Sequence, residues 1–216
     1  MSSEPLPRLP APPGVALLHR VSVKPHHVER WRELWDEERA LRGEHGFVSH
    51  RAFLETLAEP KLTWLYSHPD PAAGERELAA DPRWADLARR MAPHRFGNLL
   101  VRPVRVEVLT RADAASVAGR IAILRRYSIV GGWDAFLDIW RRIVPVRERY
   151  GFRCLVAVAD EPKDMFTWAF DFAGSWAEFP AAQRDYYHDP ARVDLRGVFD
   201  HMADYSVGPA DQLLLD

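Results

Sequence analysis

Two similar stretches decide the fold of this chain: "EPKLTWLYSH" from Glu59 to His68 and "EPKDMFTWAFDF" from Glu161 to Phe172. Each contains Glu-Pro-Lys, a short spacer, Thr-Trp and an aromatic residue two positions further on. Proline interrupts strand pairing while Glu and Lys favour water, so Glu-Pro-Lys indicates a turn. The apolar residues that follow indicate a strand. The sequence therefore contains the same turn-and-strand pattern twice, roughly 100 residues apart.

The segments around these stretches also recur at nearly the same spacing. "VALLHRVSV" from Val15 corresponds to "IAILRRYSI" from Ile121. Further correspondences join Trp35 to Trp140, Gly46-Phe47 to Gly151-Phe152, and Asp81-Pro82 to Asp189-Pro190. Because the offset drifts by only a few residues, we interpret the chain as an internal duplication of a unit of roughly 95 residues.

Each unit has the pattern strand, helix, strand, strand, helix, strand. Residues 15–23 are rich in β-branched side chains, and apolar residues recur at helical spacing over residues 28–41. Asp81-Pro82 and Asp189-Pro190 each place a capping oxygen before a proline, which divides the second helix of each unit. The predicted fold class is α+β, with two tandem ferredoxin-like βαββαβ units. Each unit leaves one sheet face bare, so we expect the two antiparallel sheets to pack into one α/β barrel.

The chain boundaries follow from composition. We expect a disordered, proline-rich arm at residues 1–14, a first barrel half at 15–109, a linker at 110–119 and a second barrel half at 120–216. The arm contains five prolines, which cannot donate a regular ladder of backbone hydrogen bonds. The linker contains small and polar residues without an apolar period.

Composition narrows the classes of partner. The 216 residues include 29 Lys and Arg against 31 Asp and Glu, with no strongly basic stretch, which argues against nucleic acid. No apolar run approaches the roughly 20 residues that span a bilayer. A single cysteine, Cys154, excludes an internal disulfide and a cysteine-based zinc site, and we interpret it as an inert buried thiol. We expect a cytoplasmic protein with a small-molecule substrate, no nucleic-acid or membrane partner, and a possible homodimer.

One row of the third strands is unusually aromatic. It consists of Trp64, Tyr66 and His68 in the first unit and Trp168, Phe170 and Phe172 in the second. Alternate residues of a strand share a face, so each row lies together. We predict that this row faces the barrel lumen, where it holds a flat ligand. The alternative is that these aromatics form a core beneath the helices.

The first strands add polar candidates to the same cavity. His19 and Arg125 occupy corresponding positions, and Val21 and Tyr127 are the next pair along. A His, an Arg and a Tyr among apolar neighbours suit a cavity for a carbonyl, carboxylate or phenol. Alternatively, their polar tips reach solvent at a barrel end. His50, on the second strand, is a further candidate.

With these residues in place, the chain resembles the NIPSNAP family of the dimeric α/β-barrel superfamily. The resemblance is carried by "RRYSIVGGWDAFLDIW" (125–140), "YGF" (150–152), "FTWAFDF" (166–172), "AEFPAAQRDYYHDPAR" (177–192), "HRVSVKP" (19–25), "TWLYSH" (63–68) and "ERELAADPRWADL" (75–87). The first unit departs from the family pattern, because Val21 replaces the usual Tyr and His26-His27 replaces a common Gly. The superfamily, as the resemblance implies, includes cofactor-independent monooxygenases, cyclases, isomerases, heme-degrading enzymes and non-catalytic proteins. It shares no catalytic residue set, so none is carried over.

These observations favour an enzyme, such as one of secondary metabolism, that binds an apolar or aromatic metabolite in the lumen. It would steer a cyclisation, isomerisation, dehydration or oxygenation without a cofactor or metal. His68 or His19 is the predicted proton-transfer group, because imidazole titrates near neutrality. Tyr66, Arg125 and Tyr127 would orient polar substituents between walls formed by Trp64 and Trp168. The alternatives are a non-catalytic binding protein with a filled barrel and a heme protein, with His94 and His201 placed where some such barrels supply a heme ligand.

Overall fold

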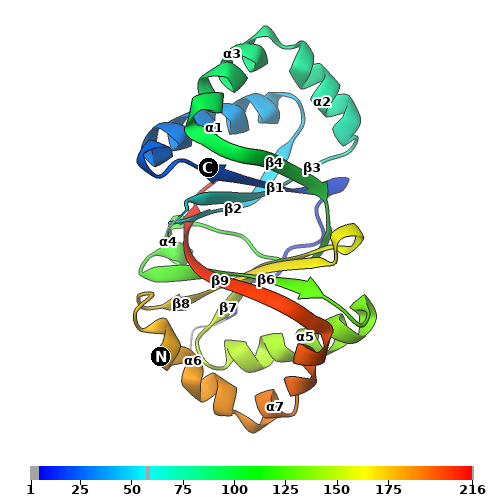
Figure 1. The fold of residues 1–216 in the computed structure, drawn as a ribbon, viewed down its shortest axis with the longest axis vertical. Coiled ribbons are helices and arrows are strands. Elements are labelled where there is room, and N and C mark those ends of the chain that lie inside the picture. The colour runs from blue at the N-terminus through cyan, green and yellow to red at the C-terminus, as the bar shows by residue number, and fades with distance from the viewer. Residues whose placement is uncertain (1–4, 57–58, 216) are drawn as a thin grey trace. The chain divides into compact units, whose positions relative to one another are not determined.

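The computed structural model describes residues 5–56 and 59–215, which form two compact units (Figure 1). Among the described residues, the first half consists of residues 12–56, 59–104 and 211–215, and the second half consists of residues 5–11 and 105–210. The expectation of disorder over residues 1–4 falls outside the described residues.

The first half has four antiparallel strands in the order β4-β1-β3-β2. The strands are β1 (Val15–Val23), β2 (Val48–Glu55), β3 (Lys61–His68) and β4 (Arg95–Pro103). The helices are α1 (Val28–Glu44), α2 (Pro71–Ala80) and α3 (Pro82–Met91), with short 3-10 turns η1 (Pro25–His27) and η2 (Ala92–His94). Helices α1, α2 and α3 all lie on one face of this sheet (Figure 1).

The second half repeats this arrangement with one additional edge strand, in the order β9-β6-β8-β7-β5. The strands are β5 (Arg105–Leu109), β6 (Arg120–Ile129), β7 (Arg153–Asp160), β8 (Met165–Ala173) and β9 (Met202–Leu213). The helices are α4 (Ala114–Val117), α5 (Trp133–Glu148), α6 (Phe179–His188) and α7 (Pro190–Val193), with 3-10 turns η3 (Glu161–Lys163) and η4 (Arg196–His201). The α+β class and the βαββαβ order of each half are confirmed.

Segments from the two ends of the chain complete the opposite halves. In the second half, the Leu9 backbone N–H donates to the Leu109 carbonyl at 2.8 Å, and Arg8 forms an isolated bridge with Thr110. In the first half, Arg51 donates to the Gln212 side chain at 3.2 Å. Part of the arm that we expected to be disordered is therefore paired with the second half.

Local signals in the sequence explain several element ends. The side chains of Asp81 and Asp189 accept backbone hydrogen bonds at 2.8 and 2.7 Å and so cap α3 and α7, as predicted. Gly46 and Gly151 follow the two long helices with φ of 81° and 82°, a conformation that L side chains rarely adopt. The predicted linker contains α4, which Asp113 caps.

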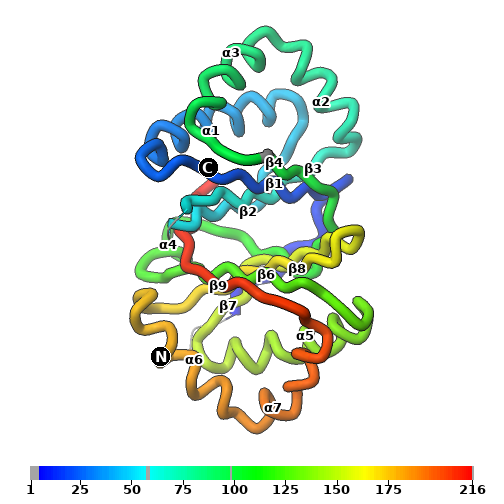
Figure 2. The backbone as a smooth tube through the Cα atoms, in the orientation of Figure 1, coloured from blue at the N-terminus to red at the C-terminus, as the bar shows by residue number. Residues whose placement is uncertain are grey.

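The aromatic rows face the helices. In the first half, the Trp64 ring lies 5.5 Å from the ring of Trp35 on α1, and in the second half Trp168 lies 5.6 Å from Trp140 on α5. The backbone trace in Figure 2 shows each set of helices on one side of its own sheet. The prediction that these rows face a lumen is wrong, because the apolar stripes of the long helices bury their area against the bulkiest strand side chains.

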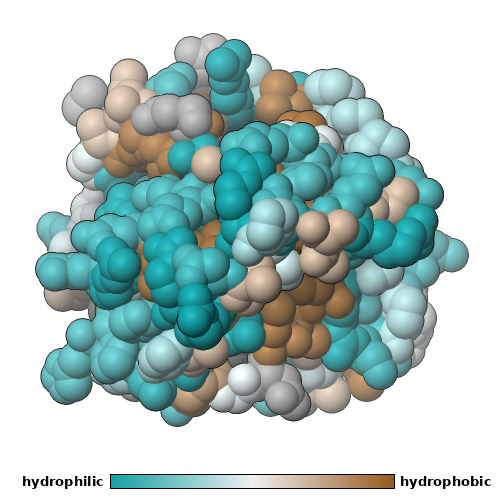
Figure 3. Space-filling view, turned by 90° about the horizontal axis from the view of Figure 1, so that it is seen from above, coloured by the Kyte–Doolittle hydropathy of each residue, from teal (hydrophilic) through white to brown (hydrophobic). Residues whose placement is uncertain are grey.

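The face seen in Figure 3 is mostly hydrophilic, with scattered apolar patches. In the first half, ion pairs join the helices at the surface, including Arg90 to Glu37 and Arg83 to Glu44. Among the residues that the structure describes, no helix is both long enough and apolar enough to cross a membrane.

Candidate ligand-binding site

A cavity of about 330 Å³ lies between the sheet and the helices of the second half. Its polar lining consists of three arginines, four tyrosines and a glutamine: Arg125, Arg147, Arg192, Tyr127, Tyr186, Tyr187, Tyr205 and Gln183. Its apolar lining consists of Trp140, Ile143, Trp168, Val198, Phe199, Met202 and Val207. Every lining residue belongs to the second half, so this half contains the whole cavity.

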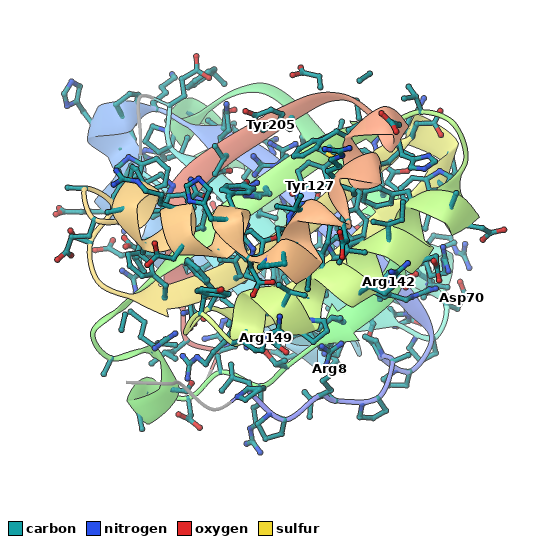
Figure 4. The ribbon with its side chains drawn as sticks, turned by 90° about the horizontal axis from the view of Figure 1, so that it is seen from below. Arg8, Asp70, Tyr127, Arg142, Arg149 and Tyr205 are labelled. Carbon is teal, nitrogen blue, oxygen red and sulfur yellow. The ribbon has the colours of Figure 1, made fainter. Side chains whose placement is uncertain are left out.

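Periodicity brings these side chains together. Arg125 and Tyr127 are alternate residues of β6 and share its helix-facing side. On α5 and α6, lining residues recur at intervals of three and four, which places them on one face of each helix. Tyr205 on β9 is the register partner of Tyr127, and Figure 4 shows the two tyrosines near one another at the edge of the helix layer. Tyr205 is exposed and marks the open side of the cavity.

Arg125 is tied to the polar side chains of α6. Its Nη1 donates to the Tyr187 hydroxyl at 3.3 Å, and its Nη2 donates to Oε1 of Gln183 at 3.0 Å. Burial acts to lower its pKa, but the oxygens of Tyr127 and Tyr187 outweigh burial and raise it. Arg125 is therefore a fixed cation in the cavity wall.

Arg147 is the most deeply buried cation of the site, with 2% of its surface exposed. Its guanidinium carbon lies 4.1 Å from the ring centre of Tyr186 and 4.2 Å from that of Phe170. Within the described part of the chain, its Nε and Nη1 atoms have no hydrogen-bond partner. Burial lowers its pKa, because the charged form loses its hydration. A buried guanidinium with unpaired N–H donors gains more free energy than most groups do when a hydrogen-bond acceptor binds to it.

Arg192 completes a cluster of three cations. It is buried, and its guanidinium carbon lies 5.5 Å from the ring centre of Tyr187 and 5.2 Å from that of Phe199. Among the described residues, no carboxylate lines the cavity or forms an ion pair with any of the three arginines. The site therefore offers guanidinium donors to an oxyanion within aromatic and aliphatic walls.

These cations also act on the phenol of Tyr187. Burial acts to raise the pKa of its phenol, but Arg125, Arg147 and Arg192 outweigh burial and hold that pKa below its ordinary value. A phenol of this kind ionises more readily than an ordinary tyrosine, and its phenolate can accept a proton and return it.

The structure brings three of the predicted site residues into the cavity, namely Arg125, Tyr127 and Trp168. Phe170 contacts the cations of Arg125 and Arg147 from the core, and Phe172 packs in the same core. The first-half candidates Trp64 and Tyr66 lie in the first core, with ring centres 4.4 Å apart.

The three histidine candidates lie in the first half and outside the cavity. His19 is 1% exposed, and neither ring nitrogen has a hydrogen-bond partner among the residues that the structure describes. Burial, together with Arg42 and Arg95, lowers its pKa to about 3. We chose His19 because imidazole titrates near neutrality, and this buried imidazole does not. His68 accepts from the Asp70 N–H at 2.9 Å and donates to the His45 carbonyl at 3.1 Å. His50 bonds to the Ser67 hydroxyl at 2.8 Å, and burial lowers its pKa.

The heme alternative finds no support in the cavity. His94 is bonded to His27 through their Nδ1 atoms at 2.8 Å, and neither His94 nor His201 lines the cavity. Among the described residues, the lining contains no histidine or cysteine, so it does not fit a heme held by an imidazole or thiolate ligand. In the described part of the chain, no three His, Cys, Asp or Glu residues are grouped as a metal site.

Sequence reasoning missed the helical contributors to this site, namely Arg147, Gln183, Tyr186, Tyr187 and Arg192. One signal was available. Arg42 and Arg147 stand the same number of residues after Trp35 and Trp140, so the apolar stripe of each long helix ends in an arginine.

Comparisons with known proteins identify solved structures of similar fold. No family model and no curated protein sequence matches this chain. A "putative monooxygenase" from Fusobacterium nucleatum has a TM-score of 0.62 at 11% identity, with 92% of each chain covered. Another from Lactobacillus acidophilus has a TM-score of 0.60 at 9% identity, covering 94% of this chain and 99% of that chain. An anthrone oxidase-like protein has a TM-score of 0.61 at 11% identity, covering 92% and 91%. At these identities the similarity shows the fold alone.

Proposed function

We propose that the second half binds a small aromatic or apolar molecule with an acidic C–H or O–H group and catalyses proton transfer from it. The observation that carries this proposal is the cavity in which three buried arginines and Tyr187 face one another without a carboxylate. The names of the structural neighbours, monooxygenases and an anthrone oxidase-like protein, support an oxygenase-type reaction. The motifs described above support a NIPSNAP-like member of the superfamily.

In the proposed mechanism, Tyr187 acts as its phenolate, and the phenolate oxygen accepts the substrate proton to become the neutral phenol. The electron pair left on the substrate delocalises onto its oxygen, and Arg125 or Arg192 stabilises that oxyanion. Trp140 and Trp168 hold the ring system and exclude water. Return of the proton to another carbon completes an isomerisation, whereas reaction of the carbanion with dioxygen gives an oxygenation.

Anthrone is a suitable test compound, because its methylene group is a C–H acid flanked by aromatic rings. Its oxidation is balanced as anthrone plus dioxygen giving anthraquinone plus water: both methylene C–H bonds break, a C=O bond forms, and the second oxygen atom leaves as water. We expect the protein to accelerate anthraquinone formation and exchange of the methylene hydrogens in deuterated buffer. The first is measured by absorbance and oxygen uptake, and the second by proton NMR.

Tyr187→Phe removes the proton acceptor and leaves the ring in place. We expect it to lower both rates by about a hundredfold or more. Tyr150→Phe is the control, because Tyr150 is exposed, lies outside the cavity and has a hydroxyl that donates to Asp189 at 2.9 Å. Equal rates for Tyr187→Phe and the unmodified protein would refute the assignment of Tyr187. Binding of anthrone without exchange or oxidation would indicate a binding protein instead.

A further inference from the structure

The two halves place an arginine at the same position of their long helices. Arg42 on α1 and Arg147 on α5 are both 2% exposed. Each guanidinium carbon lies 5.1 Å from a corresponding phenylalanine ring, that of Phe47 in the first half and that of Phe152 in the second. The first half therefore serves as an internal reference for how this fold accommodates a buried guanidinium at this position.

In the first half, two carboxylates neutralise the arginine. Arg42 donates from Nε to Glu38 at 3.0 Å and from Nη1 to Glu75 at 2.7 Å. Glu38 is itself buried, one helical turn before Arg42. The charge of Arg42 is thus satisfied within the protein, as buried charges usually are.

The second half retains the arginine and lacks both carboxylates. Ile143 stands at the position of Glu38, and Gln183 stands at the position of Glu75. The two atoms of Arg147 without a partner are Nε and Nη1, the same two that Arg42 uses. Arg147, Ile143 and Gln183 all line the cavity, so the cavity adjoins the positions at which the two acids are missing.

We infer that the ligand of this cavity is an aromatic carboxylate, whose carboxylate binds Arg147 in place of the two missing acidic side chains. This inference rests on the proposed function and adds the class of its substrate. Arg125 and Arg192 strengthen the preference for an anion, since neither has a carboxylate partner among the described residues. The apolar lining from Trp140 to Val207 suits the aromatic body of such a molecule.

The test compares naphthoate with naphthamide, which has the same ring system without the charge. Trp140 and Trp168 line the cavity, so quenching of tryptophan fluorescence reports binding, and calorimetry checks it. We expect naphthoate to bind at least about tenfold more tightly than naphthamide, as is typical of a charge-assisted hydrogen bond. Gln183→Glu introduces, at a partly exposed position, the acid that the first half has at Glu75. This variant should weaken naphthoate binding by about tenfold or more and change naphthamide binding by less than about twofold.

Ile143→Glu restores the other acid, and Ile143→Gln is its uncharged match. Only Ile143→Glu should weaken the binding of naphthoate more than the binding of naphthamide. Glu75→Gln, in the first half, should leave binding of both compounds unchanged. Equal affinity for naphthoate and naphthamide, failure of both to bind, or equal weakening of both by Gln183→Glu would overturn the carboxylate assignment.

The two proposals fail in different ways. Loss of acid selectivity with anthrone turnover intact overturns the carboxylate assignment alone. Selective naphthoate binding with no proton exchange on anthrone overturns the proposed catalysis alone.

Discussion

Acidification should destabilise the first half through His19, and the size of the effect follows from the structure. The imidazole is buried beside the rings of Trp64 and Tyr66, at 5.5 and 6.2 Å, and both of its nitrogens are without partners. Burial, then Arg42 and Arg95, lower its pKa from 6.5 to about 3. Between these values the unfolded chain binds a proton that the folded protein does not. Stability is therefore unaffected by His19 above about pH 6.5 and falls as the pH drops from there towards 3.

Each pH unit in this window corresponds to about 1.4 kcal/mol, so the loss at about pH 5 is roughly 2 kcal/mol. His19→Leu removes the titrating group. We expect its free energy of unfolding, relative to the unmodified protein, to improve by roughly 2 kcal/mol between about pH 7.5 and pH 5. Urea denaturation at the two pH values measures this difference. His26→Gln is the control, because His26 is exposed. A difference that stays constant within about 0.5 kcal/mol would show that the folded protein protonates His19 normally, and would refute the reasoning.

Two further predictions concern buried charges. Arg147→Met removes a cation with two unpaired nitrogens and should raise the free energy of unfolding by about 1 kcal/mol or more. Arg42→Met leaves Glu38 buried without its partner and should lower the free energy of unfolding by about 3 kcal/mol. Changes of the same sign in the two variants, measured by urea denaturation, would contradict the comparison of the halves. Asp171 is fully buried and accepts from Arg153 at 2.6 Å and from Arg120 at 2.9 Å, so Asp171→Ala should cost about 3 kcal/mol or more. The exposed Asp185→Ala should change stability by less than about 0.5 kcal/mol, and thermal or urea unfolding of both variants checks this.

The element order was predictable because local physics determines it. The β-branched run of β1, the helical stripe of α1 and the Asp-Pro pairs at Asp81 and Asp189 each act over a few residues. The orientation of the strands was not predictable in this way. Every residue of β7 is buried, and on β6 both Leu124 and Arg125 are buried, so alternation of polarity does not distinguish the two faces.

The candidate site was predictable only where strands supply it. Arg125, Tyr127 and Trp168 could be named because the period of a strand fixes which residues share a face. Arg147, Tyr187 and Arg192 come from three separate helices, and their convergence depends on how those helices pack on the sheet. His19 shows the opposite error, since an imidazole that titrates near neutrality in water does not do so when buried without a partner.

The difference between the halves is therefore more informative than their similarity. A fold that carries the same buried arginine twice shows, at Arg42, that it can neutralise the charge with its own acids. At Arg147 no carboxylate among the described residues neutralises the charge, and Arg147 lines a cavity. An unpaired buried cation destabilises the free protein, and the same cation gains a partner when an anion binds. Reduced stability of the empty second half and selectivity for a carboxylate thus have one physical cause, and a ligand that binds there should raise the unfolding temperature of the unmodified protein more than that of Gln183→Glu.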